Sequence, residues 1–162
     1  MKKMTREQAI NNILDRIGKE ALVISSTGRI SRELFELRKK RGERTDDFYM
    51  QGSMGLALPI GLGVALNTNK KVYVLTGDGA LLMKLGSMAT FLKERPSNLE
   101  VIVLNNNCHD STGGQPTAFS AVRSFVEKHC SIIDVEKGSR DNLGRPTISP
   151  QEIKNNFMEK CR

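Results

Sequence analysis

The sequence predicts an α/β fold, a three-layer αβα arrangement in which helices cover both faces of a parallel sheet. Apolar runs with the length of buried strands alternate along the chain with stretches of helical periodicity. Two of these runs, residues 71–76 and 99–104, end directly on residues that suit a ligand site, Gly77-Asp78-Gly79 and Asn105-Asn106. Sheets of this kind bind ligands at the carboxyl ends of their strands.

The first two predicted helices flank one predicted strand. Thr5-Arg6-Glu7-Gln8 forms a capping box, and the apolar stripe that follows it ends at Gly18. Residues 21–24 are expected to form a buried strand, and Ser25-Ser26-Thr27-Gly28 the loop that leaves it. A second helix is indicated by apolar residues at helical spacing, namely Ile30, Leu34, Phe35 and Leu37.

The middle of the chain is expected to add a short strand at residues 48–50, after a polar loop at residues 41–47. The turn Gln51-Gly52-Ser53-Met54-Gly55 follows, and then a helix of small residues that can pack closely on the sheet. A single helix is predicted over residues 80–93, and Pro96 ends it.

The last third of the chain is expected to contribute one strand and one helix. Residues 132–135 form the apolar core of the predicted strand. Ser149 is the predicted N-cap of the last helix, with Pro150 at the first helical position and Glu152 completing a second capping box.

The composition fits one compact domain, residues 1–162, because 38% of the residues are hydrophobic. The three cysteines (Cys108, Cys130 and Cys161) show no C-x-x-C spacing, which argues against a disulfide framework or a zinc site and favours the reducing cytoplasm. No apolar signal core follows the first residues, and the apolar run at residues 54–66 is too short to span a bilayer. We therefore expect a cytoplasmic protein that does not enter the membrane.

The formal net charge of +7 is concentrated in Arg38-Lys39-Lys40-Arg41. Binding to nucleic acid is not expected, because the chain has no Trp and only two Tyr to stack on bases. Two interpretations of the basic cluster stay open. It is either a solvated helix end, where positive charge suits the helix dipole, or a basic rim that attracts an anionic substrate or an acidic partner.

The two motif loops predict a metal-held diphosphate. Asp78 and Asn106 lie 28 positions apart, each directly after a predicted strand, so that a βαβ unit brings them to the same edge of the sheet. Their side chains offer the hard oxygen atoms that Mg²⁺ prefers, and Gly79-Ala80 opens a helix whose free N–H groups can hold phosphate. The simpler alternative is that Asp78 only caps this helix.

With these motifs the chain resembles the thiamine diphosphate-dependent decarboxylases, in their diphosphate-binding half. The family signature is G-D-G, a gap of roughly 25–30 residues and N-N. A gap of this length fits one βαβ unit, in which each motif follows one of the two strands. The likeness is greater to phosphonopyruvate decarboxylases and to the β subunits of sulfopyruvate decarboxylases. The shared phrases are Ser31-Arg32-Glu33-Leu34-Phe35, Gly52-Ser53-Met54-Gly55-Leu56-Ala57, Gly77-Asp78-Gly79-Ala80-Leu81-Leu82-Met83, His109-Asp110-Ser111-Thr112-Gly113-Gly114-Gln115-Pro116-Thr117 and Gly138-Ser139-Arg140.

The resemblance implies a thiamine diphosphate-binding fold and a ligand set for Mg²⁺. The Asp78 carboxylate, the Asn106 side chain and the Cys108 carbonyl would bind the metal ion. The diphosphate would be held by Gly77, Gly79 and Ala80, and on its other side by Thr27 and Gly28.

The resemblance also implies roles for the Gly52-Ser53-Met54 turn and for His109. Backbone atoms of Gly52 and Met54 would bind the aminopyrimidine, and the Met54 side chain would hold the cofactor in its bent shape; otherwise Met54 is ordinary core. His109 would face the substrate or close the site, with a structural hydrogen-bond donor as the alternative. The thiol of Cys108 is expected to be inert, because no basic residue precedes it.

Two departures from the family pattern concern activity. The chain leaves no room for the pyrimidine-binding half, whose glutamate activates the cofactor, so we expect a β subunit that needs an α subunit and is inactive alone. An apolar face around residues 52–58 would dock that partner. Residues 118–130 are also fewer than in the relatives, which leaves the last strand order open.

Three functions follow from these observations. The favoured one is a non-oxidative 2-oxo acid decarboxylase that converts sulfopyruvate or phosphonopyruvate to the aldehyde. The alternatives are a carboligating, acetolactate synthase-like subunit and a non-catalytic or shortened partner subunit.

Overall fold

The computed structural model describes residues 3–162, and its main feature is a five-stranded sheet in which every strand pair is parallel. This confirms the predicted fold class. The strand order across the sheet is β2-β1-β3-β4-β7. The strands are β1 (Leu22–Ser25), β2 (Phe48–Tyr49), β3 (Val72–Gly77), β4 (Leu99–Asn105) and β7 (Ser131–Asp134).

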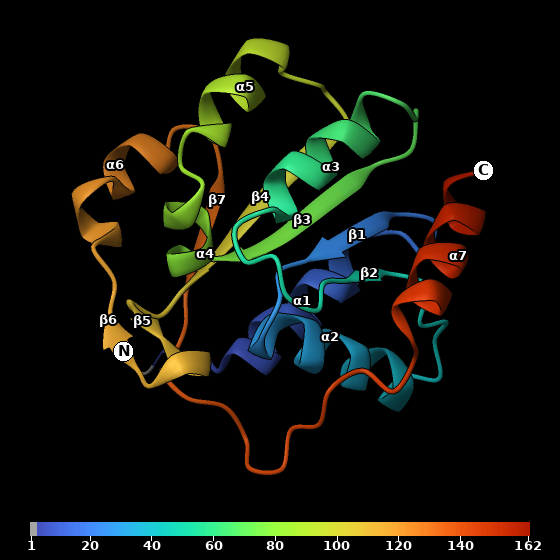
Figure 1. Cartoon of the computed structure of the whole chain (residues 1–162), viewed down its shortest axis with the longest axis horizontal. Coiled ribbons are helices and arrows are strands. Elements are labelled where there is room, and N and C mark those ends of the chain that lie inside the picture. The colour runs from blue at the N-terminus through green and yellow to red at the C-terminus, as the bar shows by residue number, and fades with distance from the viewer. Residues whose placement is uncertain (1–2) are drawn as a thin grey trace.

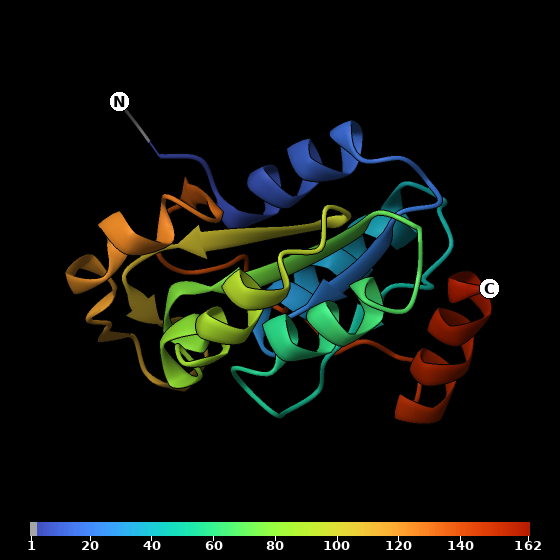
Figure 2. The same ribbon diagram turned by 90° about the horizontal axis from the view of Figure 1, so that it is seen from above.

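Helices cover both faces of this sheet (Figures 1 and 2). Helices α1 and α2 lie on one face, and α3, α4 and α5 on the other, with α7 at the edge beside β2. Among residues 3–162 no helix combines the length and the apolar character that crossing a membrane requires. The helices are α1 (Arg6–Arg16), α2 (Arg29–Lys40), α3 (Ala57–Ala65), α4 (Asp78–Met83), α5 (Ser87–Glu94), α6 (Arg123–Val126) and α7 (Pro150–Cys161).

Two hydrophobic cores, one on each face, hold the layers together. The apolar sides of α1 and α2 pack on one face of β1, β3 and β4, around residues such as Ile10, Leu34 and Ile102. The core on the other face joins α3, α4 and α5, and includes Leu58, Met88 and other buried residues. Because both faces are covered, the central strands are almost continuously apolar, as expected for a parallel sheet.

The strand order creates a crevice between β1 and β3. The chain leaves β1 into α2 on one face, and leaves β3 into α4 on the opposite face. Loops that diverge in this way leave an opening at the carboxyl ends of the strands, where ligands bind in folds of this class.

Local sequence signals located both capped helices correctly. Thr5 caps α1 and Ser149 caps α7, and each forms the complete capping box that the sequence predicts, with Gln8 and Glu152 respectively. The strands predicted at residues 21–24, 71–76, 99–104 and 132–135 are present within one residue of these bounds.

The single helix predicted over residues 80–93 is wrong, because the chain forms two helices, α4 and α5, separated by residues 84–86. Lys84 leaves the helical conformation, with φ −134° and ψ 41°. Ser87 donates both its N–H (2.8 Å) and its hydroxyl (2.7 Å) to the Lys84 carbonyl, which offers the backbone an alternative to the helical bond. Gly86 lies in the break, where its conformational freedom lowers the helix propensity further.

The short segment at residues 118–130 still connects β4 to a neighbouring parallel strand. After β4 the chain forms a small hairpin, β5 (Cys108–His109) with β6 (Gln115–Pro116), then the short helix α6. Phe119 and Val126 are fully buried in the core and anchor this connection. Strand β7 then pairs directly with β4, which resolves the strand order that the sequence left open.

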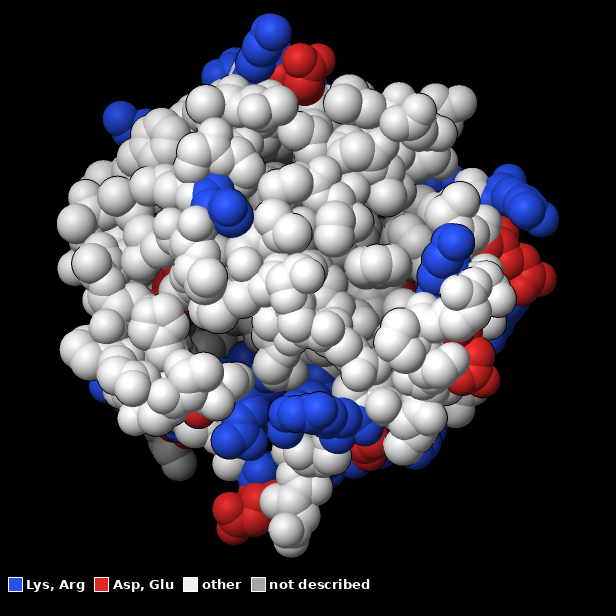
Figure 3. Space-filling view, viewed as in Figure 1, with Lys and Arg blue, Asp and Glu red and all other residues white. Residues whose placement is uncertain are grey.

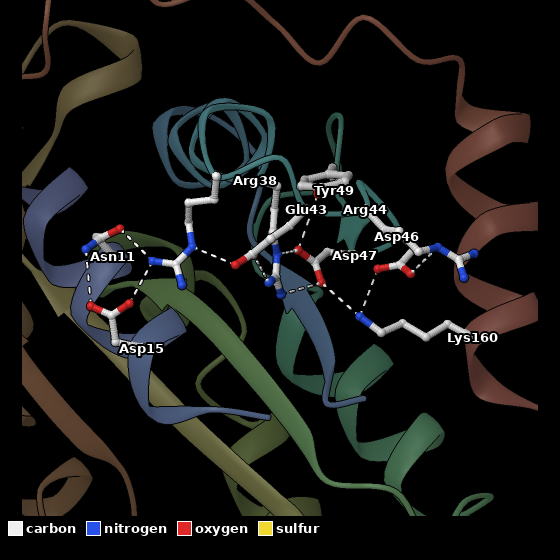
Figure 4. A network of polar contacts seen from close by, with 10 residues as sticks. Asn11, Asp15, Arg38, Glu43, Arg44, Asp46, Asp47, Tyr49 and Lys160 are labelled. Atoms are coloured by element: carbon white, nitrogen blue, oxygen red, sulfur yellow. Dashed lines mark hydrogen bonds and ion pairs between the residues drawn. The ribbon is translucent and has the colours of Figure 1, made fainter. Parts of the chain in front are cut away.

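Neither interpretation of the basic cluster describes Arg38, which is buried at the end of α2 (Figure 4). Its guanidinium contacts Asp47 (2.8 and 3.2 Å) and Glu43 (2.6 Å). Arg41 also pairs with Glu43, at 2.8 Å. Lys39 and Lys40 keep about half of their side-chain surface exposed (50% and 49%), so only these two resemble a solvated helix end.

Candidate active site

A cavity of about 660 Å³ opens at the carboxyl ends of the strands, where the sequence predicts a ligand. It is lined by the loops that follow β1, β2, β3 and β4. Arg6 of α1 and residues 145, 146 and 150, at the end of the segment that leads into α7, also line it, so the structure brings together residues that are far apart in the sequence. The predicted site residues that line this cavity are Thr27, Gly28, Gly52, Met54, Gly77, Asp78, Gly79, Ala80, Asn106, Cys108 and His109.

Asp78 stands at the start of α4 with 2% of its surface exposed. Its Oδ2 atom accepts a hydrogen bond from the Thr117 hydroxyl at 2.5 Å, and its Oδ1 atom is 3.5 Å from the Asn106 N–H. Within residues 3–162 no Lys, Arg or His forms an ion pair with this carboxylate, although other buried carboxylates such as Glu33 and Asp47 have one. A buried carboxylate without a cationic partner is typical of a metal ligand.

The Asn106 side chain is held in one orientation by its neighbours. Its Nδ2 group donates to Asp110 at 2.6 Å, and its Oδ1 atom accepts from the Cys108 N–H at 3.1 Å. Because an ionised carboxylate only accepts hydrogen bonds, Asp110 fixes which end of the amide is the oxygen. The oxygen keeps a second lone pair with which to bind a metal ion.

The hairpin leaves the Cys108 carbonyl without an N–H donor on the residue opposite it. Pro116 stands opposite Cys108 in the hairpin and has no N–H to donate, whereas the carbonyls of Asn107 and His109 accept from Thr117 and Gly114. The thiol of Cys108 donates to Asp110 at 2.8 Å. Burial and the Asp110 carboxylate raise the pKa of this thiol to about 11, which agrees with the expectation of an inert side chain.

The loops after β1 and β2 contact each other at the other side of the cavity. The Gly52 N–H donates to the Thr27 hydroxyl at 2.7 Å, so this N–H is already engaged. Gly28 has φ +90°, and a Cβ atom added there would lie 2.7 Å from the Ser111 hydroxyl oxygen. A side chain at residue 28 would therefore be strained and would collide with the 110–112 turn.

His109 lies over the first turn of α4. A Cβ atom added to Gly79 would lie 2.5 Å from Cε1 and 2.6 Å from Nδ1 of the imidazole. The close approach explains why residue 79 is glycine, independently of any phosphate contact. The half-buried ring faces the cavity beside Asp78 rather than the apolar core.

Two predictions concern the turn after β2: that its residues line the cavity, and that residues 52–58 form an exposed apolar face. Met54 lines the cavity and is half-buried, but Ser53 is exposed and does not line it. The apolar face expected around residues 52–58 is wrong, because Ala57 and Leu58 are 1% and 2% exposed. They pack in the core of this chain, since α3 needs its apolar residues to cover the sheet.

A buried charge network that sequence reasoning missed supports the loop that carries Asn106. Arg6 binds Glu33 through two nitrogens (2.9 and 3.2 Å) and Asp110 through the third (3.0 Å). It also donates to the Gly138 carbonyl at 2.9 Å, and the Gly138 N–H donates to Asp110 at 3.0 Å. Asp110 thus links Arg6 of α1 to Asn106. The only sequence signal was that Arg6, Glu33, Asp110 and Gly138 each lie in a motif noted for another reason.

Burial alone would raise the pKa of Asp110, but hydrogen bonds from Cys108 and Arg6 outweigh it and hold this pKa below its usual value. Asp110 is therefore ionised at neutral pH and acts as an acceptor for all of its neighbours.

The residues present fit Mg²⁺ and a diphosphate. Within the described part of the chain no three His, Cys, Asp or Glu side chains gather into a metal cluster. The candidate site depends instead on one carboxylate, one amide oxygen and one backbone carbonyl, which is a hard oxygen donor set suited to Mg²⁺. Since these donors supply one negative charge, the remaining positions suit phosphate oxygens and water.

The comparisons with known proteins identify the family of the chain. Residues 26–142 match the family described as "Thiamine pyrophosphate enzyme, C-terminal TPP binding domain". The chain is 39% identical to a phosphonopyruvate decarboxylase of Streptomyces viridochromogenes, over 94% of this chain and 45% of the relative. It is 41% identical to the sulfopyruvate decarboxylase subunit beta of Methanocaldococcus jannaschii, over 97% of this chain and 80% of the relative.

The fold has a counterpart among solved structures. A Mycobacterium smegmatis protein, provisionally assigned as a thiamin diphosphate-dependent enzyme, matches with a TM-score of 0.55 at 13% identity, over 85% of this chain and 32% of that chain. This chain spans less than half the length of the Streptomyces relative (45%). The chain belongs to the thiamine pyrophosphate enzymes, in which it corresponds to the C-terminal TPP binding domain.

Proposed function

We propose that the chain, as a single diphosphate-half domain, is the β subunit of a two-subunit decarboxylase for sulfopyruvate or phosphonopyruvate. One observation supports it above all: the buried Asp78 carboxylate, which has no cationic partner within residues 3–162, faces the same cavity as Asn106, Cys108 and the glycine loops. The two relatives named above are decarboxylases of these two substrates.

The protein groups divide the work of binding. Asp78, the Asn106 oxygen and the Cys108 carbonyl would hold Mg²⁺, and the N–H groups of Gly79 and Ala80 would bind the diphosphate. When bound, thiamine diphosphate supplies the electron sink that makes loss of CO₂ from a 2-oxo acid possible.

Met54 and His109 would act on the parts of the ligand that lie further from the metal. Met54 lines the cavity after β2 and would hold the bent shape of the cofactor through its side chain. The His109 ring, placed over Gly79, would close the cavity on the diphosphate side and exclude water there.

The proposal includes a companion subunit that carries the activating glutamate. The M. jannaschii relative is named a beta subunit, and this chain covers 80% of its length. No Glu is among the described residues that line the cavity, so the activating glutamate would come from the companion subunit. The exposed Gln51-Gly52-Ser53 edge, rather than an apolar face, is the part of the β2 turn left for such a partner.

Calorimetric titration of the full chain with thiamine diphosphate and Mg²⁺, with and without the companion, tests the proposal. Tight binding and decarboxylation are expected only for the complex. Asp78→Ala should abolish Mg²⁺-dependent binding, whereas Glu94→Ala, which removes an exposed carboxylate on α5, should leave it unchanged.

Two results would reject parts of this proposal. Unchanged cofactor affinity in Asp78→Ala would remove the metal assignment. Decarboxylation of sulfopyruvate by the homogeneous chain alone would reject the two-subunit arrangement.

A further inference from the structure

Three arginines line the cavity in addition to Arg6. Arg29 and Arg32 lie at the start of α2, and Arg145 lies in the segment between β7 and α7. Lys and Arg side chains gather beside a hollow below the centre of Figure 3, in the region where Figure 1 draws α2 and this segment. Arg29 and Arg32 are half-buried, and Arg145 is exposed.

These three arginines differ from most others of the described chain in their partners. Within residues 3–162 none of them forms an ion pair, whereas six arginines elsewhere do. Arg29 donates to the Ser139 hydroxyl at 2.6 Å, and Arg32 to the Leu143 carbonyl at 3.4 Å, and both acceptors are neutral. Within residues 3–162 no ion pair neutralises these charges, although the Glu33 carboxylate, which pairs with Arg6, also acts on Arg29 through space.

The contacts of Arg29 and Arg32 also hold the cavity wall in place. Ser139 and Leu143 belong to the same segment as Arg145, so α2 fixes this segment across the cavity mouth. Three arginines that line one cavity, each with several N–H donors, suit a tetrahedral oxyanion such as a sulfonate or a phosphonate.

We infer that Arg29, Arg32 and Arg145 bind the remote sulfonate or phosphonate group of the substrate. The inference rests on the proposed function for the identity of the substrate, but the arginine group itself does not depend on it. Under the proposed function Asp78, the α4 N–H groups and the Thr27-Gly28 loop would serve the metal and the diphosphate, so these arginines remain for a second anion in the same cavity. Binding of this second anionic group would make the site prefer a dianionic 2-oxo acid to pyruvate, which lacks the group.

Calorimetric titration of the full chain with phosphonoacetate, an unreactive dianion, tests the site without turnover. Acetate is the control ligand, because it lacks the tetrahedral group. Arg32→Gln and Arg145→Gln should each weaken phosphonoacetate binding by about tenfold or more, the loss expected for one charge-assisted hydrogen bond. Arg16→Gln removes the same charge from an exposed position on α1 outside the cavity and should have no effect.

In the complex with the companion, the same two variants should raise the KM for sulfopyruvate and leave that for pyruvate unchanged. An equal loss of phosphonoacetate affinity in Arg16→Gln would overturn the inference, since only overall charge would matter. Weaker binding of thiamine diphosphate with Mg²⁺, at unchanged phosphonoacetate affinity, would also overturn it and assign the arginines to the cofactor.

Binding of phosphonoacetate by a complex that decarboxylates no 2-oxo acid would reject the proposed function but support the anion site.

Discussion

Arg6 and Arg38 form nearly the same buried structure at opposite ends of the sheet. Each guanidinium binds one carboxylate through two nitrogens, Arg6 with Glu33 (2.9 and 3.2 Å) and Arg38 with Asp47 (2.8 and 3.2 Å). Each uses its third nitrogen for a second carboxylate. The exposed fractions of the two arginines are equal, 5%.

The two networks differ in what they hold. The Arg6 network ends on Asp110, which orients Asn106 and Cys108 in the candidate metal site. The Arg38 network ends on Asp47, where Lys160 of α7 approaches to 3.6 Å (Figure 4). The same chemical unit therefore positions the loop that carries Asn106 at one end, and fastens the last helix to the edge of the sheet at the other.

Replacing either arginine by methionine should give the largest effect. Arg38→Met leaves the fully buried Asp47 without its main partner and should lower the free energy of unfolding by roughly 3–5 kcal/mol. Arg6→Met should cost a similar amount because Glu33 is also buried. Urea denaturation measures both, and a loss below about 1 kcal/mol in either would contradict the importance of the pair.

Asp110→Asn and Asp47→Asn separate the two networks by function. Asp110→Asn should weaken Mg²⁺-dependent cofactor binding by about 10–100-fold, as expected when a group that orients a metal ligand is lost. Asp47→Asn should lower stability and leave cofactor affinity unchanged, because Asp47 does not line the cavity. Calorimetric titration of the complex with the companion measures the cofactor affinity of both variants. Equal cofactor affinities would contradict the different roles given to the two networks.

Acid should remove the contribution of Asp110 to stability. Because its pKa is lowered in the folded state, the stabilisation is fully present above the unfolded pKa of about 3.9 and is lost as the pH falls through the lower folded value. The stability advantage of the wild-type chain over Asp110→Asn should thus be larger at pH 7 than near pH 3. Urea denaturation at the two pH values measures it, and an advantage that grows in acid would be inconsistent with the network.

An exposed ion pair between α1 and α2, the two helices that Arg6 and Glu33 also join, should contribute least to the free energy of unfolding. Lys40 of α2 contacts Glu7 of α1 at 2.8 Å, but the lysine side chain is 49% exposed. Lys40→Gln should change the free energy of unfolding by at most about 1 kcal/mol, since solvent screens such pairs. Thermal unfolding at low and high salt provides the measurement, and a larger loss would show that burial is not what distinguishes Arg6.

The sequence predicts the parts of this structure that depend on near neighbours. Both capping boxes join residues three positions apart, and the strands are marked by continuous apolar runs. The main site loops were also predictable, because parallel strands bring their carboxyl ends together whatever the length of chain between them.

The remaining features depend on contacts between distant residues. Arg6 lies 27 positions from Glu33 and 104 from Asp110, and no local pattern relates the three. Arg38 was misinterpreted for the same reason, since a basic helix end looks solvated until the loop that carries Asp47 covers it. The break between α4 and α5 was missed because a serine side chain competes there with the backbone.

The contact between Arg6 and Gly138 has a consequence for the order in which the protein matures. It joins residues 132 positions apart, so the network around Asp110 cannot form until most of the chain has been synthesised. Four of the five strands, β1 to β4, lie within residues 22–105, so most of the sheet can assemble earlier during translation. A nascent chain shorter than about 140 residues should therefore form these four strands before the network that holds the Asn106 side chain is complete, because residue 138 has yet to emerge.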